Sequence, residues 1–144
     1  MINRETDYAI RCVLHLARKA GEVIMVNEIS RKNDIPKSFL AKILQKLTKA
    51  EIVRSFRGVK GGYQFSKEPS KINLLHVIET IQGPIFLNKC MVDRKACSRR
   101  KTCTVHPLWN IMAECLTERL QGCNIEELLK GEARVKAGNT FFRR

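Results

Sequence analysis

The sequence contains no long hydrophobic run and no export signal. Its apolar stretches fall short of the roughly 18 residues that a membrane-spanning helix needs. The N-terminal segment "MINRETDYAI" is polar where a secretory signal would be apolar. These absences predict a cytoplasmic protein with no membrane partner. Because thiols stay reduced in that compartment, the six cysteines indicate metal or redox chemistry rather than disulfides.

Signatures of catalysis and of nucleotide binding are also missing. The sequence shows no paired nucleophile and base, no glycine-rich nucleotide fingerprint and no pattern typical of a substrate pocket. The chain has 144 residues, of which 44% are hydrophobic, and this is enough for one ordinary folded core. We therefore expect a protein that is not an enzyme and has no small-molecule substrate.

Acidic residues are scarce relative to basic ones. The chain has 14 acids against 27 lysines and arginines, which gives a net charge of +13. Residues 31–67 alone hold ten of these cations and two acids. Such a cluster can be a solvated face, and it also suits an anionic membrane or an acidic protein. Its density favours nucleic acid as the partner.

The N-terminal part, residues 1–83, has the pattern of a winged helix-turn-helix DNA-binding domain. Helical periodicity marks four segments, at about 6–20, 26–34, 37–49 and 72–82. The short connection "NDIP" joins the second and third of them, as in a helix-turn-helix. Two strand-like runs at about 52–66 flank a glycine-rich tip, which is typical of a β-hairpin. Segment 37–49 is then the recognition helix and 52–66 is the wing.

The exposed positions of these two elements carry the candidate DNA contacts. The face of the recognition helix opposite its apolar stripe is polar and basic. Its residues are Lys37, Ser38, Lys42, Gln45, Lys46 and Lys49. Lysines anchor phosphates, while Ser and Gln can touch base edges. Arg57 and Lys60 lie at the wing tip, where an arginine suits a narrow minor groove.

The rest of the chain adds three further pieces. A cysteine-rich loop covers 84–105, and 106–130 holds a long amphipathic helix and a short final helix. A small domain with such a helix commonly buries it in a twofold dimer, although the helix can also pack on its own domain. The tail 131–144 has no strong period and is expected to be mobile. The predicted fold class is mainly α with a small β-hairpin, a winged helix-turn-helix domain plus a long C-terminal dimerisation helix.

The loop spacing is C-x6-C-x5-C-x2-H, from Cys90 through Cys97 and Cys103 to His106. Structural zinc normally uses a pair of cysteines two to four residues apart, and these three offer none. Wider gaps suit an iron–sulfur cluster, whose ligands surround several atoms. Nearby cations would favour thiolates and help to neutralise an anionic cluster. A metal-free thiol sensor, a zinc site and a loop without a ligand stay open as alternatives.

The other cysteines and histidines have plainer expected roles. Cys12, Cys115 and Cys123 are interpreted as packing or incidental residues, because a lone helical cysteine usually behaves as a small hydrophobe. His15 and His76 lie within predicted helices and are interpreted as packed or surface residues rather than ligands.

Four motifs follow one another in the chain: "DYAIRCVLHLA", "IPKSFLAKILQKL", "RGVKGGY" and a three-cysteine loop that ends in "HPLW". Over about residues 1–130 this order resembles the Rrf-type family of winged-helix repressors, whose members respond to iron–sulfur status, nitric oxide, iron or cysteine metabolism. The resemblance implies a homodimer that binds palindromic operators in double-stranded DNA. It places Ser38, Phe39 and Lys42 in the major groove and Arg57 in the minor groove.

The resemblance also implies a cluster held by Cys90, Cys97 and Cys103 with one further ligand. A 2Fe–2S cluster can take a histidine three residues after the last cysteine, where His106 stands. Some 4Fe–4S members take a carboxylate from the first helix of the partner subunit, a position that Asp7 occupies. Both candidates are present, and His106 can instead stabilise the start of the long helix.

These observations predict a dimeric DNA-binding transcriptional regulator, a repressor, that senses iron–sulfur status, redox state or nitric oxide through a cluster. One alternative is a metal-free regulator of the cysteine-metabolism type, switched by its thiols or by a partner protein. Another is a small iron–sulfur redox or carrier protein whose basic surface binds an acidic partner. Salt-sensitive DNA binding would separate the regulators from the carrier.

Overall fold

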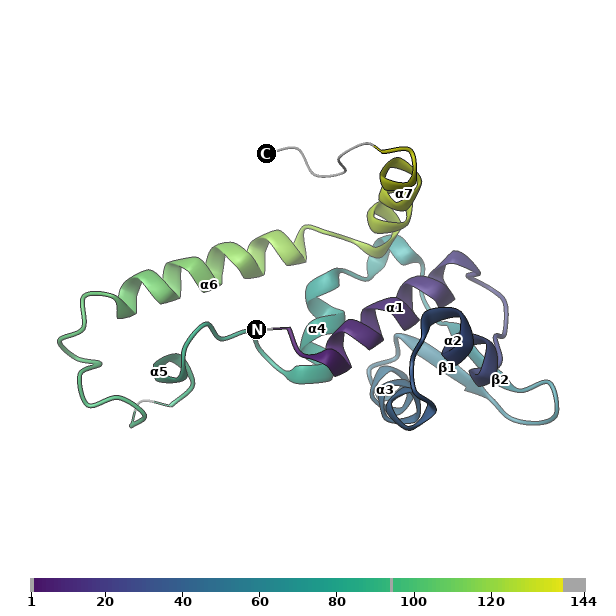
Figure 1. Ribbon diagram of the computed structural model, residues 1–144, viewed down its shortest axis with the longest axis horizontal. Helices are drawn as coiled ribbons and strands as arrows, with labels where there is room; N and C mark the ends of the chain where they lie inside the picture. The colour runs from purple at the N-terminus through teal and green to yellow at the C-terminus, as the bar shows by residue number, and fades with distance from the viewer. Residues whose placement is uncertain (1, 94, 139–144) are drawn as a thin grey trace.

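The computed structural model describes residues 2–93 and 95–138, which form a helical body with a hairpin at one end and an extended arm at the other (Figure 1). The elements follow in the order α1 (Arg4–Arg18), α2 (Val26–Asn33), α3 (Lys37–Lys49), β1 (Val53–Phe56), β2 (Gly62–Phe65), a 3-10 turn (Pro69–Lys71), α4 (Leu74–Gln82), α5 (Lys89–Val92), α6 (His106–Gln121) and α7 (Ile125–Lys136). The prediction of a mainly α fold with a small β-hairpin is confirmed.

Helix α1 is the centre of the body and contacts α2, α3, α4 and α7. The Asn3 side chain caps it by accepting a hydrogen bond from the backbone N–H of Thr6 at 2.8 Å. Glu5 and Asp7 lie in the first turn, where carboxylates suit the positive end of the helix dipole. The inward face is fully buried and includes Cys12 and Leu16. This helix is therefore the support on which the other elements are placed.

The turn between α2 and α3 is closed by local hydrogen bonds. Asp34 takes a left-handed conformation with φ of 52°, which ends α2. The Ser30 hydroxyl then donates to the Ile35 carbonyl at 2.7 Å, and the Ser30 carbonyl accepts from the Ile35 N–H at 3.0 Å. Pro36 occupies the N-cap position of α3, where its carbonyl accepts from the Phe39 and Leu40 N–H groups and no side-chain cap is formed. Helix α3 spans the predicted 37–49 and buries a leucine and isoleucine stripe. The angle between the two helices is thus fixed at the turn itself.

Strands β1 and β2 pair antiparallel, from Val53 with Phe65 to Phe56 with Gly62. The hairpin is also joined to the segment between α1 and α2, since Ile24 and Tyr63 exchange two backbone hydrogen bonds of 2.8 and 2.9 Å. Gly62 permits this approach, because a Cβ there would lie 2.2 Å from the Ile24 carbonyl oxygen. The wing is therefore anchored to the body along β2, close to the turn.

The chain leaves the body after α4, where Gly83 has φ of 79°. In the described part of 84–121, the buried residues are Ile85, His106 and Ala113. Helix α6 projects away from the body and the loop that carries α5 lies beside it (Figure 1). Within the described ranges, no helix combines the length and the apolar character that crossing a membrane requires.

Helix α7 returns to the body and corrects one expectation. Asn124 caps it through the Glu127 N–H at 2.9 Å, and Ile125 is fully buried. The final helix was expected to end near residue 130, but it continues to Lys136, whereas the mobility expected of the tail stays a prediction. Glu132 accepts a 2.8 Å hydrogen bond from Arg18 of α1, a partner that the local sequence pattern does not reveal. Residues 139–144 lie outside the described residues.

Candidate nucleic-acid interface and cysteine loop

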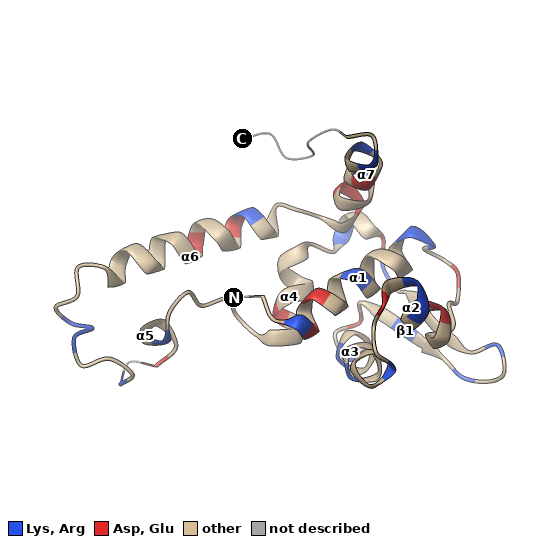
Figure 2. Cartoon of the chain, viewed as in Figure 1, with Lys and Arg blue, Asp and Glu red and all other residues tan. Residues whose placement is uncertain are grey.

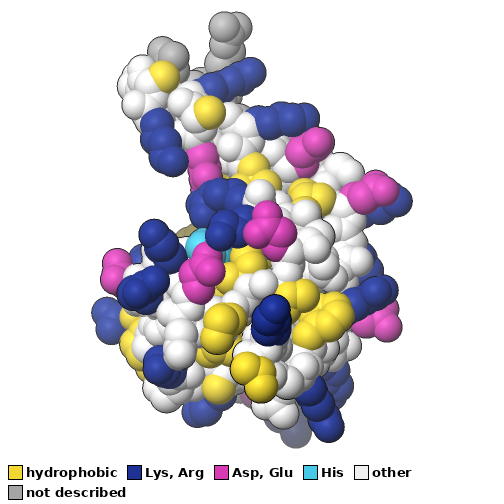
Figure 3. Space-filling model, turned by 90° about the vertical axis from the view of Figure 1, so that its right-hand side faces the viewer, with side chains coloured by type: hydrophobic (Ala, Val, Ile, Leu, Met, Phe, Trp, Pro, Cys, Tyr) yellow, Lys and Arg dark blue, Asp and Glu magenta, His cyan; other side chains and the backbone are white. Residues whose placement is uncertain are grey.

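The outward face of α3 presents the predicted polar residues to solvent. Lys37, Ser38, Phe39, Lys42 and Gln45 are all exposed. Figure 2 shows lysine and arginine along α3 and in the loop at the end of the hairpin. Seen from the hairpin side, Lys and Arg side chains are spread around several hydrophobic patches (Figure 3). This surface combines cations for phosphates with apolar and polar groups for base edges.

Phe39 is held in place from the body. Its ring meets Tyr8 of α1 edge to face, with centroids 5.7 Å apart and planes at 74°, and it stays 41% exposed. The guanidinium of Arg11 lies 5.7 Å from the Tyr8 ring centroid. Sequence reasoning did not single out Tyr8. The three-residue spacing of Tyr8 and Arg11 on one helix is the signal that could have indicated their contact.

The wing tip carries Arg57 and Lys60, both exposed. Gly58 has φ of 105°, and its carbonyl accepts a 2.9 Å hydrogen bond from the Gly61 N–H. A Cβ on Gly61 would lie 2.4 Å from the Phe56 carbonyl oxygen. The glycines thus close a tight turn that sets the two cations at the end of the hairpin.

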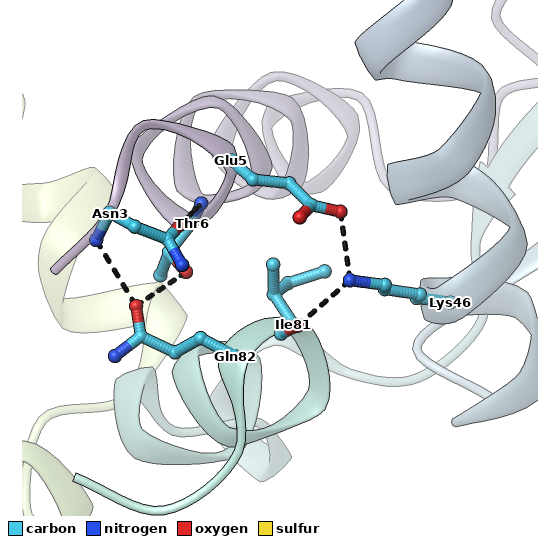
Figure 4. A network of polar contacts seen from close by, with 6 residues as sticks. All are labelled: Asn3, Glu5, Thr6, Lys46, Ile81 and Gln82. Atoms are coloured by element: carbon cyan, nitrogen blue, oxygen red, sulfur yellow. Dashed lines mark hydrogen bonds and ion pairs between the residues drawn. The ribbon is translucent and has the colours of Figure 1, made fainter. Parts of the chain in front are cut away.

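Lys46 departs from the predicted arrangement. Its ammonium turns inward and donates to Glu5 of α1 at 2.8 Å and to the Ile81 carbonyl of α4 at 2.9 Å (Figure 4). The expectation that Lys46 belongs to the outward polar face is corrected, because the boundary of that face lies at this residue. A long lysine stem at such a boundary can reach either side.

Asp7 also has a partner on its own helix. Its carboxylate lies 2.7 Å from the guanidinium of Arg11, one turn further on, and both side chains are about half exposed. This is an ordinary i, i+4 ion pair on a helix surface. The described chain therefore places Asp7 where solvent and a second molecule can reach it, but with its charge already paired.

The cysteine loop brings two of its four predicted ligands together. Cys90 lies in α5, and its Sγ is 3.4 Å from Nδ1 of His106, the buried first residue of α6. Cys97 and Cys103 are half-buried free thiols elsewhere in the loop. In 2–93 and 95–138, no three His, Cys, Asp or Glu side chains form a group that could hold a metal ion. The donor types suit an iron–sulfur cluster, but of these donors the structure brings only Cys90 and His106 into contact.

The remaining cysteines lie in different surroundings. Cys12 is fully buried, and burial raises the pKa of its thiol to about 12, so it is an unreactive packing residue. Burial also raises the pKa of Cys123. Cys115 is exposed on α6. The structure thus separates an inert core thiol from the accessible ones on the arm.

Helix α6 has an uncovered apolar face. Four of its large hydrophobic residues are between 38% and 56% exposed and recur at helical spacing: Leu108, Ile111, Met112 and Leu116. Ala113 is the one buried hydrophobic residue of the helix. The expected option of packing on its own domain therefore does not account for this face. Exposed apolar faces of this kind mark sites of association.

Comparison with known proteins decides the family. Residues 2–131 match the family model described as "Rrf2: Iron-dependent Transcriptional regulator". The chain belongs to the Rrf2 family. It is 30% identical over 123 residues to the HTH-type transcriptional regulator IscR of Aliivibrio salmonicida, covering 85% of this chain and 73% of the relative. The resemblance seen in the sequence is confirmed, and this Rrf2-family chain is a helix-turn-helix transcriptional regulator rather than an enzyme.

Solved structures confirm the winged-helix fold of this Rrf2-family chain. It is similar to CymR, the global cysteine regulator of B. subtilis, with a TM-score of 0.75 and 24% identity, covering 90% of this chain and 96% of that one. It is also similar to IscR of T. potens, with a TM-score of 0.70 and 21% identity, covering 90% and 86% of the two chains. At these identities the likeness concerns the fold.

Proposed function

We propose that this Rrf2-family regulator is a homodimeric repressor that binds a palindromic operator in double-stranded DNA and works in the cytoplasm, as a regulator of this family would. The observation that carries the proposal is the exposed face of α3 beside an anchored wing. Insertion of one helix into the major groove with a basic hairpin reaching the adjacent groove is a recurrent docking geometry.

The exposed residues of α3 and the wing would contact different parts of the DNA according to their chemistry. Lys37, Lys42 and Lys60 would bind phosphates and set the position of the protein on the duplex. The exposed Ser38 and Gln45 can donate to and accept from base edges, and Phe39 can contact a thymine methyl group. Arg57 at the hairpin tip would enter the minor groove, whose negative potential favours arginine.

Assembly would use the apolar face of α6. In a twofold dimer this face would meet the same face of a second copy, which removes from water the side chains that the single chain leaves exposed. A palindromic operator follows from such symmetry, because two identical reading surfaces recognise two inverted half-sites.

For the sensing role we propose an iron–sulfur cluster held by Cys90, Cys97, Cys103 and His106. The 3.4 Å contact between Cys90 and His106 supports the histidine, whereas Asp7 already pairs with Arg11. The cluster would supply a reaction centre for oxidants or nitric oxide, and its gain or loss would alter the loop between the reading domain and α6. His106 belongs with a 2Fe–2S cluster and the partner's Asp7 with a 4Fe–4S cluster, so the test distinguishes the two.

The test is an iron, sulfide and visible-absorption measurement on protein purified without oxygen. Wild type should be coloured and contain iron and sulfide, and Cys97→Ala should lose all three. His106→Ala should lose or weaken the cluster, whereas Asp7→Asn, the control for the other ligand, should keep it. Retention in His106→Ala with loss in Asp7→Asn would reverse the ligand assignment. The iron content per chain then gives the cluster type.

One observation favours a second candidate, a metal-free regulator switched by thiols or by a partner protein. Cys97 and Cys103 belong to no group with the Cys90–His106 pair in the described chain, and both are accessible. Colourless protein whose DNA binding is lost on mild oxidation and restored by a thiol reductant would establish this form. The family assignment leaves the third alternative, a small redox or carrier protein, without support.

A further inference from the structure

One lysine links the C-terminal half of the recognition helix to two other helices. Lys46 of α3 donates to Glu5 in the first turn of α1 and to the carbonyl of Ile81 in the last turn of α4, at 2.8 and 2.9 Å. Its side chain is 40% exposed and that of Glu5 is 27% exposed. Figure 4 shows both bonds reaching from α3 across to α1 and α4. Two of the three N–H groups of the ammonium are therefore bonded within the protein.

The same turn of α4 is fixed to α1 by a second set of bonds. The Gln82 side-chain oxygen accepts from the Thr6 hydroxyl at 2.8 Å and from the Asn3 N–H at 3.2 Å. Thr6 is fully buried. The start of α1 and the end of α4 thus form one rigid support, and Lys46 attaches α3 to it.

We propose that Lys46 is a positioning residue for operator recognition, which fixes α3 on this support and makes no contact with DNA. The proposal rests on the proposed reading role of α3. Apart from this bond pair, the C-terminal half of α3 is seated by the buried side chains of Ile43, Leu44 and Leu47. Apolar contact is non-directional. It therefore opposes separation of the helices, but it opposes a small sliding of one helix along the other only weakly. Hydrogen bonds with a charged donor are directional and short, and they fix the register of the helix.

Salt dependence separates positioning from phosphate contact. A lysine bound to a phosphate releases counterions, so its loss weakens binding to every sequence and lowers the salt slope. A lysine that only positions the helix affects affinity through the contacts of other side chains with base edges. Its loss weakens the preferred sequence, while binding to an unrelated duplex and the salt slope stay the same.

The experiment compares Lys46→Met with Lys42→Met, which removes the same charge one turn away on the outward face. The probes are the duplex that the full-length wild-type protein selects from a random pool and a scrambled duplex of equal length, each titrated over a salt series. Lys46→Met should bind the selected duplex about tenfold more weakly, with unchanged scrambled binding and slope. Lys42→Met should weaken both and lower the slope by about one. Lys46→Arg, which can still bridge both acceptors, should restore selected-duplex binding.

Two further measurements extend the test, and the first of them stays decisive if Lys46→Met folds poorly. Glu5→Gln removes the partner charge while leaving Lys46 in place, and it should give a smaller loss on the selected duplex alone. In free protein, hydrogen exchange of the last turn of α3 should be faster in Lys46→Met than in Lys42→Met. Parallel losses on both duplexes, or unchanged selected-duplex binding, would overturn the positioning role. A wild type that selects no duplex would instead overturn the proposed function.

Discussion

The reading domain and the arm differ in how many of their apolar side chains are buried within a single chain. The reading domain, residues 2–83 with α7 against it, encloses a continuous core in which residues such as Leu16, Leu40 and Leu47 are fully buried. The arm, residues 84–121, buries few side chains in its described part and leaves an apolar helix face and four thiols at least partly accessible. The domain that we propose to read DNA is complete within one chain, whereas the arm, which we propose to assemble and sense, keeps apolar side chains and thiols that a partner can contact.

The largest expected effect comes from a cavity in the reading domain. Leu47→Ala should lower the free energy of unfolding by about 2–5 kcal/mol, the usual result of truncating a fully buried leucine. Chemical denaturation followed by circular dichroism measures it. Leu108→Ala on the arm, where the side chain is half exposed, is the matched variant and should cost much less in dilute protein. Equal losses would contradict the contrast between the two regions.

The next effect tests the arm as an assembly surface. Ile111→Glu places a charge in the exposed apolar face of α6 and should weaken the dimer by about 2 kcal/mol or more, as charge burial in an interface does. Sedimentation over a concentration series measures the dissociation constant. Gln121→Glu adds the same charge outside that face and should leave association unchanged. A wild type that is monomeric throughout would remove the dimer from the proposal.

A change at the wing tests whether the finished reading domain binds DNA through its tip. Arg57→Ala should weaken binding to the selected duplex by about 1–3 kcal/mol, the scale of a base-reading contact. Lys67→Ala, also exposed but beyond the end of β2, is a charge-matched control. Anisotropy titrations at fixed salt compare the two. An unchanged affinity in Arg57→Ala would remove this residue from the reading set.

The smallest effect concerns pH and the core of the reading domain. Burial lowers the pKa of His15, with Glu28 at 3.5 Å opposing the shift and Arg18 and Lys19 adding to it. The folded chain therefore resists a proton that the unfolded chain accepts near its ordinary pKa of about 6.5. Stability should be constant above that pH and fall as the pH drops through it toward the lowered value.

Denaturation of wild type and His15→Gln at neutral and mildly acidic pH measures this contribution. The variant has no imidazole to titrate, so it should lose less stability on acidification than wild type. If wild type and His15→Gln lose the same stability on acidification, groups other than His15 determine the pH dependence in this range.

Local signals made the reading domain predictable from sequence. Pro36 marks the start of α3, the apolar period gives its extent, and the glycines between 58 and 62 locate the hairpin turn. Contacts between distant residues could not be predicted in this way. The partners of Lys46 are 41 and 35 residues away, and Arg18 and Glu132 are 114 apart. Nothing in a local period reports such pairings.

The cysteine loop was predictable in composition but not in arrangement. Its ligands were found from residue type and spacing, while their positions depend on irregular backbone that no period describes. Cys90 and His106 meet because α5 and the start of α6 lie together. Cys97 and Cys103 lie in irregular backbone between them, on either side of a turn.

The bonds between Ile24 and Tyr63 bear on how fast the protein can find its site. A wing that was a free loop would need to order itself on the duplex, and that step would lower the association rate and add an entropic cost to binding. Here the hairpin is already held by the body, so its conformational entropy is lost on folding. Association is then governed by diffusion and by the attraction of a chain with net charge +13 to DNA.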